Sequence, residues 1–280
     1  MGHHRQPSRK ILEDLIARLN EYQVGAPDTK EMFELLSLLF QEEEAYVGSR
    51  FPLGPTTIKS LARKTGRSAQ TLEPILESMA GKGLVMDTEV KGKKSYLLTP
   101  TIFGFFEFTF MRLKQDLPYK RVAEIMERMF QKEMGSEVFD SRTAMSRTLV
   151  HERALSSISS EVASYDRVSE IIKSVDCWAI QDCFCRRKAQ LLEKSCPRQA
   201  PLEVCMALGW VAEFLIRRGF ARSATKEEAL KILDETEKLG KKIRLENLEA
   251  ELHIPVVSTV STTGKGMDIL KGRIEDYVRK

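Results

Sequence analysis

The sequence has no apolar run of about 18 residues, the length that a membrane-spanning helix needs. No apolar stretch follows the basic opening residues MGHHRQPSRK, so no secretory leader is expected there. Five cysteines in a chain without a leader indicate a reducing compartment, where thiols bind metal or stay free. We therefore expect a cytoplasmic protein that does not associate with membranes.

Catalytic and nucleotide-binding patterns are also absent. The four histidines (His3, His4, His151 and His253) are too scattered to form a site, and no acid–base pair or nucleophile–histidine couple is found. The chain has no Gly-x4-Gly-Lys-Ser/Thr loop, and without the backbone N–H groups of such a loop the phosphates of a nucleotide have no cradle. The sequence thus predicts a protein that is not an enzyme, with no catalytic or nucleotide-binding residues and no GTP.

What the chain does contain is typical of a folded globular protein: 280 residues, 42% hydrophobic and 30% charged. Most apolar residues recur at helical spacing. We expect a mainly α fold with a small β component, in four parts: an N-terminal arm (1–28), a winged helix (29–115), a helical cysteine-containing domain (116–240) and a short α/β tail (241–280).

Several helices are predicted from periodicity and capping signals. The first covers 8–22, and Asp28 with Glu31 indicates a capping box that opens a helix through Phe40. The acidic run at 41–44 is interpreted as a solvated helix face. Further helices are expected over these ranges: 103–111, 119–134, 201–218, 225–240 and 267–278, with a strand over 254–260.

The winged helix is predicted from residues 55–98. A short helix over 55–66 stops at Gly66, and a second helix begins near Thr71 with Pro74 in its first turn. Two strand-like runs follow, 84–90 and 94–98. Helix, turn, helix and hairpin in this order are typical of a winged helix.

This segment is also basic. Residues 56–94 hold eight lysines and arginines against four aspartates and glutamates, a net of +4 that equals the net charge of the whole chain. In a helix-turn-helix the second helix enters the major groove of DNA, and phosphate neutralisation supplies much of the affinity. The expected contacts to double-stranded DNA are Arg67, Ser68, Gln70 and Thr71 from the helix, and Lys91, Lys93 and Lys94 from the hairpin. A homodimer is expected because such regulators read two half-sites, and docking of protein partners is the alternative role.

The stretch from Phe103 to Phe110 places five phenylalanines in eight positions. A buried helix accounts for this density, and an aromatic surface that stacks on bases is the alternative.

Four cysteines form a compact block with the spacing Cys-x-Cys-x10-Cys-x8-Cys: Cys183, Cys185, Cys196 and Cys205. Side chains two residues apart on a helix point about 200° away from each other, so we expect Cys183 and Cys185 to lie in an extended loop. The basic residues at 186–188 favour thiolate over thiol. The spacing by itself leaves an iron–sulfur cluster, tetrahedral zinc and plain buried thiols open.

The block resembles a family of prokaryotic iron–sulfur proteins over about residues 29–240. The resemblance rests on a Gly-Phe-Phe-Glu segment before a Met-Arg, on Cys-Phe-Cys-Arg-Arg-Lys, and on Pro-Leu-Glu-Val-Cys-Met-Ala-Leu-Gly. It implies that Cys183, Cys185, Cys196 and Cys205 bind a [4Fe–4S] cluster, with zinc as the alternative, and that Cys177 lies outside the site. Members of that family continue into a ferredoxin domain, whereas no cysteine follows Cys205 in this chain.

The segment 229–280 resembles the closing part of the GTPase domain of ferrous-iron transporters of the B family. The matching stretches are Leu-His-Ile-Pro-Val-Val at 252–257 and Ser-Thr-Thr-Gly-Lys-Gly-Met-Asp-Ile-Leu at 261–270. Lys231 occupies the asparagine position of that family's base-binding motif, and only Asp234 is kept. A natural fusion and an artificial joining both explain this tail.

These observations predict a redox- or iron-responsive transcription regulator that binds metal and DNA. The alternative is a redox, iron-handling or electron-transfer accessory protein whose winged helix docks protein partners without binding DNA.

Overall fold

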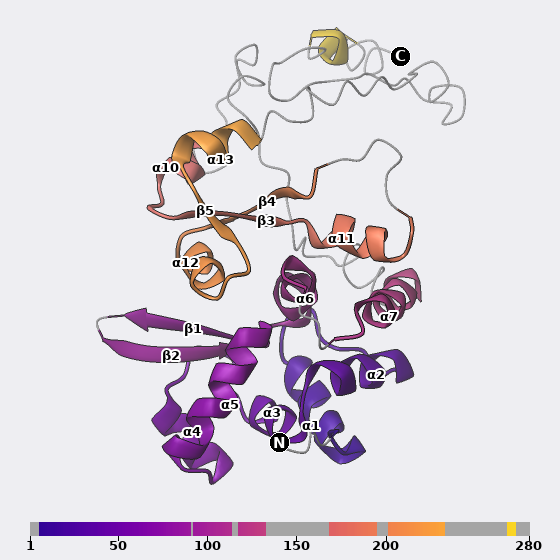
Figure 1. Ribbon diagram of the computed structural model, residues 1–280, viewed down its shortest axis with the longest axis vertical. Helices are drawn as coiled ribbons and strands as arrows, with labels where there is room; N and C mark the ends of the chain where they lie inside the picture. The colour runs from indigo at the N-terminus through magenta and orange to yellow at the C-terminus, as the bar shows by residue number, and fades with distance from the viewer. Residues whose placement is uncertain are drawn as a thin grey trace. The chain divides into compact units, whose positions relative to one another are not determined.

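The computed structural model describes residues 6–90, 92–113, 117–132, 168–194, 201–232 and 268–272 (Figure 1). It is mainly helical with small sheets, as expected. The chain divides into two compact units, one made of 1–145 and 179–222 and the other of 146–178 and 223–280. Both units combine segments that are distant in sequence, whereas the expected parts were consecutive.

The chain begins with two capped helices. In α1 (Arg9–Leu19), the side chain of Ser8 accepts a hydrogen bond from the Ile11 N–H, as an N-cap does. In α2 (Lys30–Leu39), the cap is Thr29, whose hydroxyl accepts from the Met32 N–H. The expected cap at Asp28 is therefore wrong by one residue.

The expectation that the acidic run is a solvated face holds for Glu43, which is exposed, but is wrong for Glu44. The run opens α3 (Glu42–Ser49), and Glu44 is buried. Its carboxylate accepts hydrogen bonds from the Gln41 N–H at 2.8 Å, the Ser78 hydroxyl at 2.7 Å and Lys82 Nζ at 2.6 Å. Because these partners satisfy its charge, Glu44 joins α3 to α5 from inside the protein.

Helices α4 (Ile58–Thr65) and α5 (Ala69–Lys82) form the predicted helix–turn–helix. Gly66 ends α4 with φ of 67°, a left-handed conformation that glycine adopts without steric cost. The prediction that α5 starts near Thr71 is wrong, because the Ser68 side chain caps the helix two residues earlier by accepting from the Thr71 N–H. Pro74 consequently lies inside the helix and not in its first turn.

The hairpin follows as β1 (Val85–Val90) and β2 (Lys93–Leu98), an antiparallel pair in which Val85 faces Leu98. Thr56, just before α4, forms an isolated antiparallel bridge to Tyr96 through two backbone hydrogen bonds of 2.8 and 2.7 Å. Figure 1 shows α5 beside this hairpin. The chain before α4 is thus tied to the edge of β2.

The phenylalanine-rich stretch forms a kinked turn, η1 (Thr101–Phe105), and the helix α6 (Phe106–Met111). Within η1, Ile102, Phe103 and Gly104 have non-helical backbone angles. Four of the five phenylalanines in the stretch are buried, and they pack edge-on or tilted against neighbouring rings. The buried-helix prediction is confirmed for these four. Phe103 differs, because it is 61% exposed and has φ of 56°.

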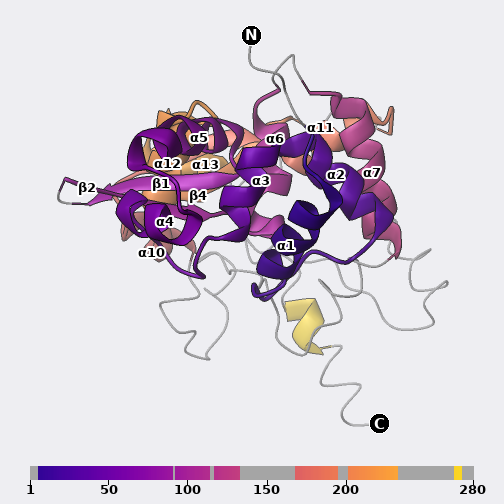
Figure 2. The same ribbon diagram turned by 90° about the horizontal axis from the view of Figure 1, so that it is seen from below.

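Helix α7 (Tyr119–Lys132) packs against α2, as Figures 1 and 2 show. Its methionines Met126 and Met129 are buried, so the methionine-rich face belongs to the core as expected. The main core also includes side chains of α1, α2, α4, α5 and the hairpin.

The cysteine-bearing segment contains β3 (Trp178–Asp182), α11 (Phe184–Leu191), β4 (Glu203–Leu208), α12 (Trp210–Arg217) and β5 (Arg222–Ala224). The strands form a sheet in the order β4-β3-β5. The prediction of one helix over 201–218 is therefore wrong in its first half. Pairing with β3 holds β4 extended, and Gly209 with φ of 62° separates it from α12.

The second unit contains α10 (Val168–Lys173) and α13 (Lys226–Ile232), which pack together. The Thr225 hydroxyl accepts from the Glu228 N–H at 3.1 Å, so the predicted helix start is confirmed. Residues 268–272 are helical, within the helix expected over 267–278, and the strand expected over 254–260 lies outside the described residues. In the part of the chain that the structure describes, no helix has the length and apolar character to cross a bilayer.

Candidate functional site

Three of the four predicted cysteine ligands lie where β3 ends and α11 begins. Cys183 follows β3 directly and is the N-cap of α11, and Cys185 lies in the first turn of that helix. Cys205 lies in β4, the neighbour of β3 in the sheet. The Cys183 N–H donates to the Leu202 carbonyl at 2.8 Å and so joins the two segments. The fourth predicted ligand, Cys196, lies outside the described residues.

The expected extended loop around Cys183 and Cys185 is wrong in part. Cys183 is extended, with φ of −67° and ψ of 115°, but Cys185 is helical. Cys183 makes no side-chain cap bond to α11, and its sulfur instead interacts with that of Cys185. The helical angle of 200° between such neighbours does not apply, because only one of the two residues is in the helix.

The three sulfurs interact through hydrogen bonds. The thiols of Cys185 and Cys205 donate to the sulfur of Cys183, and these two bonds lower the pKa of Cys183 to about 2. Burial opposes this shift, and the backbone N–H groups of Arg186 and Cys185 add to it. The same hydrogen bonds to Cys183, together with burial, raise the pKa values of Cys185 and Cys205. The thiolate form is thus favoured at Cys183, and a metal that bound all three sulfurs would displace protons from the remaining thiols.

The chemistry of these donors fits a sulfur-ligated group. Thiolate sulfur is the ligand of iron–sulfur clusters and of structural zinc. Among the described residues, no group of three or more His, Cys, Asp or Glu side chains is arranged to hold a metal ion. The three cysteines are therefore described as thiols that hydrogen-bond to one another. Cys183, Cys185, Cys205 and the fourth candidate, Cys196, would hold a sulfur-ligated group.

The basic residues that follow Cys185 have partners of their own. Arg187 pairs with Asp182, Arg186 donates to the carbonyl of Pro201, and Lys188 pairs with Glu127 on α7 at 2.5 Å. Lys188 still lowers the pKa of Cys185, but less than the hydrogen bond to Cys183 and burial raise it. These cations therefore anchor α11 as well as stabilising a thiolate, which the sequence did not indicate.

The proposed recognition helix presents a partly occupied polar surface. Ser68 and Thr71 hydrogen-bond to each other through their hydroxyls at 2.9 Å, so they also serve the helix cap. Arg67 pairs with Glu43 at 3.0 Å and lies 5.3 Å from the ring centre of Tyr46. Gln70 is exposed. Of the four predicted residues, Gln70 is thus the one whose side chain is not used in these local contacts.

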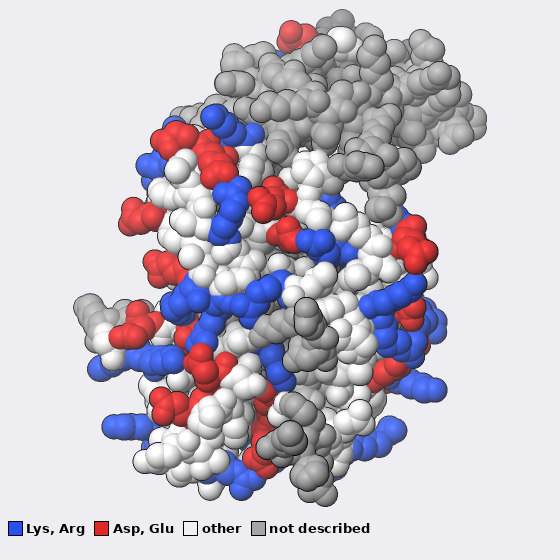
Figure 3. All heavy atoms as spheres, viewed as in Figure 1, with Lys and Arg blue, Asp and Glu red and all other residues white. Residues whose placement is uncertain are grey.

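Other cations of the helix–turn–helix and the hairpin differ in their freedom. The side chains of Lys59, Arg63, Lys64 and Lys93 are exposed. No ion pair within the described ranges uses any of these four. Lys94 instead lies 3.8 Å from Glu77 and 3.9 Å from Asp87, and Lys91 lies outside the described residues. Figure 3 shows blue and red side chains interspersed over the face in view, so the charges do not merge there into one basic field.

An ion-pair cluster joins the cysteine-bearing segment to the hairpin, and the sequence analysis missed it. Asp87 on β1 has a side chain only 4% exposed and accepts from Arg218, just after α12, at 2.9 Å. Arg217 and Lys94 also approach Asp87, and Arg218 reaches Glu77 on α5. Burial raises the pKa of Asp87, but the hydrogen bonds and charges of Arg218 and Arg217 together outweigh it and lower that pKa. A separation of 131 residues left no local signal for this contact.

Two residues of the C-terminal segment were singled out from its resemblance to a GTPase domain. Lys231 is exposed near the end of α13, and Asp234 with the loop from Ser261 lies outside the described residues. Comparison with known proteins gave no match to any protein family, curated protein or solved structure.

Proposed function

We propose that the protein is a cytoplasmic metal-binding regulator that binds double-stranded DNA and responds to iron or redox state. The observation that best supports this proposal is the meeting of the sulfurs of Cys183, Cys185 and Cys205 at the start of α11. Cys196 is the proposed fourth ligand. The preferred group is a [4Fe–4S] cluster and the alternative is zinc; when bound, it supplies a cross-link between sulfurs that depends on metal supply or oxidation.

The DNA-binding part of the proposal rests on the order of elements in the first unit. Helix α3, the Thr56 bridge, α4, α5, β1 and β2 follow one another as in a winged helix. In such a module α5 would enter the major groove and the hairpin would lie along the phosphates. Lys59, Arg63, Lys64 and Lys93 are exposed and suited to phosphate contact. Two such modules in a homodimer would read two half-sites.

The ion-pair cluster at Asp87 supports a link between the two activities. Arg217 is the last residue of α12, which follows β4 and its Cys205, and Arg218 comes directly after it. Both arginines contact Asp87 in the hairpin. A change in the position of β4 would reach β1 through these bonds. The two-state element would be the docking of α12 on the hairpin.

Metal binding is tested on the full chain purified without oxygen. We expect a brown protein whose iron and sulfide contents match one cluster, or a colourless one with one zinc per chain. Cys185→Ser should lose the group, and Cys177→Ser, a cysteine outside the block, should retain it. A full metal complement in Cys185→Ser would show that the proposed set of ligands is wrong.

DNA binding is tested by fluorescence anisotropy with a labelled duplex at several salt concentrations. Lys93→Glu should weaken binding about tenfold at low salt and reduce the salt slope, because a phosphate contact is replaced by repulsion. Lys30→Glu, at the first residue of α2, changes the same charge outside the module and should have little effect. Equal affinity of both variants and the unaltered protein would exclude the hairpin from the interface.

A second function is favoured by the neutralised cations. Arg67 and Lys94, both predicted DNA contacts, pair with acidic side chains of the same unit. Such a mixed surface also suits a protein partner, as in a redox, iron-handling or electron-transfer accessory protein that does not bind DNA. A metal-loaded protein with no salt-dependent affinity for duplex DNA would favour this alternative.

A further inference from the structure

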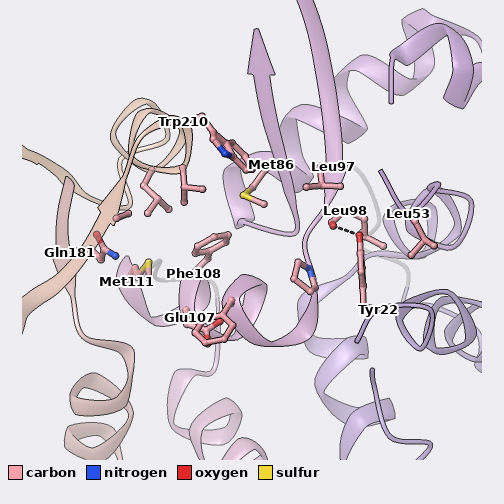
Figure 4. Close-up of a pocket in the computed structure, with 15 residues that line it drawn as sticks. Tyr22, Leu53, Met86, Leu97, Leu98, Glu107, Phe108, Met111, Gln181 and Trp210 are labelled. Atoms are coloured by element: carbon pink, nitrogen blue, oxygen red, sulfur yellow. Dashed lines mark hydrogen bonds between the residues drawn. The ribbon is translucent and has the colours of Figure 1, made fainter. Parts of the chain in front are cut away.

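The first unit contains an apolar cavity of about 430 Å³ between the hairpin, α6, β4 and α12 (Figure 4). This volume lies in the range of about 300–1,000 Å³ that is usual for small-molecule sites. Its walls include Met86 and Leu97 of the hairpin, Phe108 and Met111 of α6, and Ala207 of β4. The cavity is therefore large enough for a compact organic molecule.

One buried polar atom in the wall has no partner. The side chain of Gln181 on β3 is 6% exposed, and no described group donates a hydrogen bond to its Oε1. Figure 4 shows this side chain beside Met111 at one end of the cavity. An unsatisfied buried carbonyl costs about 1–3 kcal/mol, so a ligand that donates to it would recover that free energy.

A second polar group of the cavity already has a partner. Glu107 on α6 is 8% exposed, and its Oε2 accepts the Gly104 N–H at 2.8 Å. Burial raises the pKa of this carboxyl group above its ordinary value, although the backbone hydrogen bonds oppose that shift. Gln181 is thus the group in the wall that lacks a partner.

The rim of the cavity is aromatic and open to solvent. Phe103 is 61% exposed and Trp210 is 50% exposed, although both are large apolar side chains. Phe103 also has φ of 56°, a left-handed conformation that costs free energy in a residue other than glycine. Strained residues cluster at ligand sites, and the exposed ring of Phe103 is placed to contact a molecule in the cavity.

We propose that this cavity binds a small, mainly apolar molecule that carries a hydrogen-bond donor, and that the donor bonds to Oε1 of Gln181. The proposal goes beyond the proposed function, since it needs neither metal nor DNA. Ala207 lines the cavity and lies two residues from Cys205 on β4, so both side chains emerge on the same face of that strand. A ligand would therefore lie against the strand that carries one of the thiols.

The test uses N-phenyl-1-naphthylamine, an apolar dye with one N–H donor whose fluorescence rises in apolar surroundings. The full chain should bind it saturably with one site per chain. Its N-methyl analogue, which lacks the donor, should bind about tenfold more weakly. Absence of saturable binding would overturn the proposal. The same outcome is expected if another part of the chain fills the cavity, and in that case the proposal is wrong as well.

Variants locate the site. Gln181→Leu should weaken binding of the N–H dye about tenfold and leave its N-methyl analogue unchanged, whereas Gln131→Leu, on the exposed face of α7, should alter neither. Ala207→Phe should fill the cavity and abolish binding. If circular dichroism shows that Ala207→Phe is unfolded, Trp210→Ala at the exposed rim serves instead and should weaken binding of the dye severalfold. Unchanged binding in both Gln181→Leu and Trp210→Ala would place the dye elsewhere and overturn the proposal.

Discussion

The helix–hairpin region (42–98) and the cysteine-bearing region (178–222) are held together by different forces. Helix α5 buries four side chains, including Leu72 and Leu76, in the main apolar core. Helix α11 has no buried residue, and no residue of β4 is fully buried. Phe184 and Leu191 of α11 pack only half-buried against the main core, and ion pairs such as Lys188 with Glu127 add to this contact. The comparison indicates that apolar burial contributes more in the first region, whereas the less buried second region leaves room for a bound group to add to its stability.

The largest effect is expected from shortening a core side chain of α5. Leu76 is fully buried, so Leu76→Ala should lower the free energy of unfolding by about 3 kcal/mol through lost burial and a cavity. Leu191→Ala, at the end of the half-buried α11, should cost less than about 1 kcal/mol. Urea denaturation followed by circular dichroism measures both. Equal losses would show that the two regions do not differ in this way.

The next largest effect is expected from removal of the metal, which should change the stability of the cysteine-bearing region and not that of the helix–hairpin region. A ligand present at a hundred times its dissociation constant stabilises the state that binds it by about 2.7 kcal/mol. Chelation or cluster loss should therefore reduce the hydrogen-exchange protection of α11 and β4 and leave α5 unchanged. Exchange of the loaded and stripped proteins is compared by mass spectrometry. Uniform loss of protection over both regions would contradict a local stabilising role for the metal.

A smaller loss is expected at the bond between the regions. Asp87→Asn removes the charge that Arg218 faces and should lower the free energy of unfolding by about 2 kcal/mol. This is less than the roughly 3–5 kcal/mol expected when a buried ion pair is fully broken, because Arg218 keeps its pair with Glu77. Glu89→Gln, at an exposed position on the same strand, should change stability by less than about 0.5 kcal/mol. Thermal unfolding of the two variants gives the comparison.

The same bond predicts the acid response. Burial raises the pKa of Asp87 in the folded protein, but the hydrogen bonds and charges of Arg218 and Arg217 together hold it below its ordinary value of 3.8. The pKa of Glu77 is lowered by Arg218. A carboxylate whose pKa is lowered by folding stabilises the protein at pH values above the pKa that it has in the unfolded chain. This stabilisation is lost as the pH falls through the pKa that it has in the folded protein. The difference in unfolding free energy between the unaltered protein and Asp87→Asn should therefore be complete at pH 6 and vanish as the pH falls below 4. A constant difference over pH 2–6 would show that Asp87 acts through packing.

Local signals explain most of what the sequence predicted about the fold. Ser8 and Gly66 mark helix ends through bonds and backbone angles within a few residues, and β1 and β2 are joined by a turn that contains Gly92 with φ of 71°. The errors arose where a distant partner decides. Glu44 is buried because Lys82 reaches it, and 203–208 is a strand because β3 lies beside it.

The candidate sites divide in the same way. The family resemblance of the cysteine block implied one site that includes Cys183, Cys185 and Cys205, and the structure brings their sulfurs within hydrogen-bonding reach. No pattern in the sequence indicated that Lys94 pairs with Glu77, or that Gln181 lines a cavity. Those contacts join residues from elements that are far apart in the chain.

The sequence by itself determined the helix–turn–helix, the hairpin and the buried phenylalanine segment, because caps, turns and apolar periodicity act over a few residues. Only the tertiary structure decided that β4 is a strand, that Glu44 and Asp87 are buried beside cations, and that the hairpin, α6, β4 and α12 enclose a cavity. The physical reason is that a strand, a buried charge and a cavity each depend on what packs against them, and those partners lie tens of residues away or more.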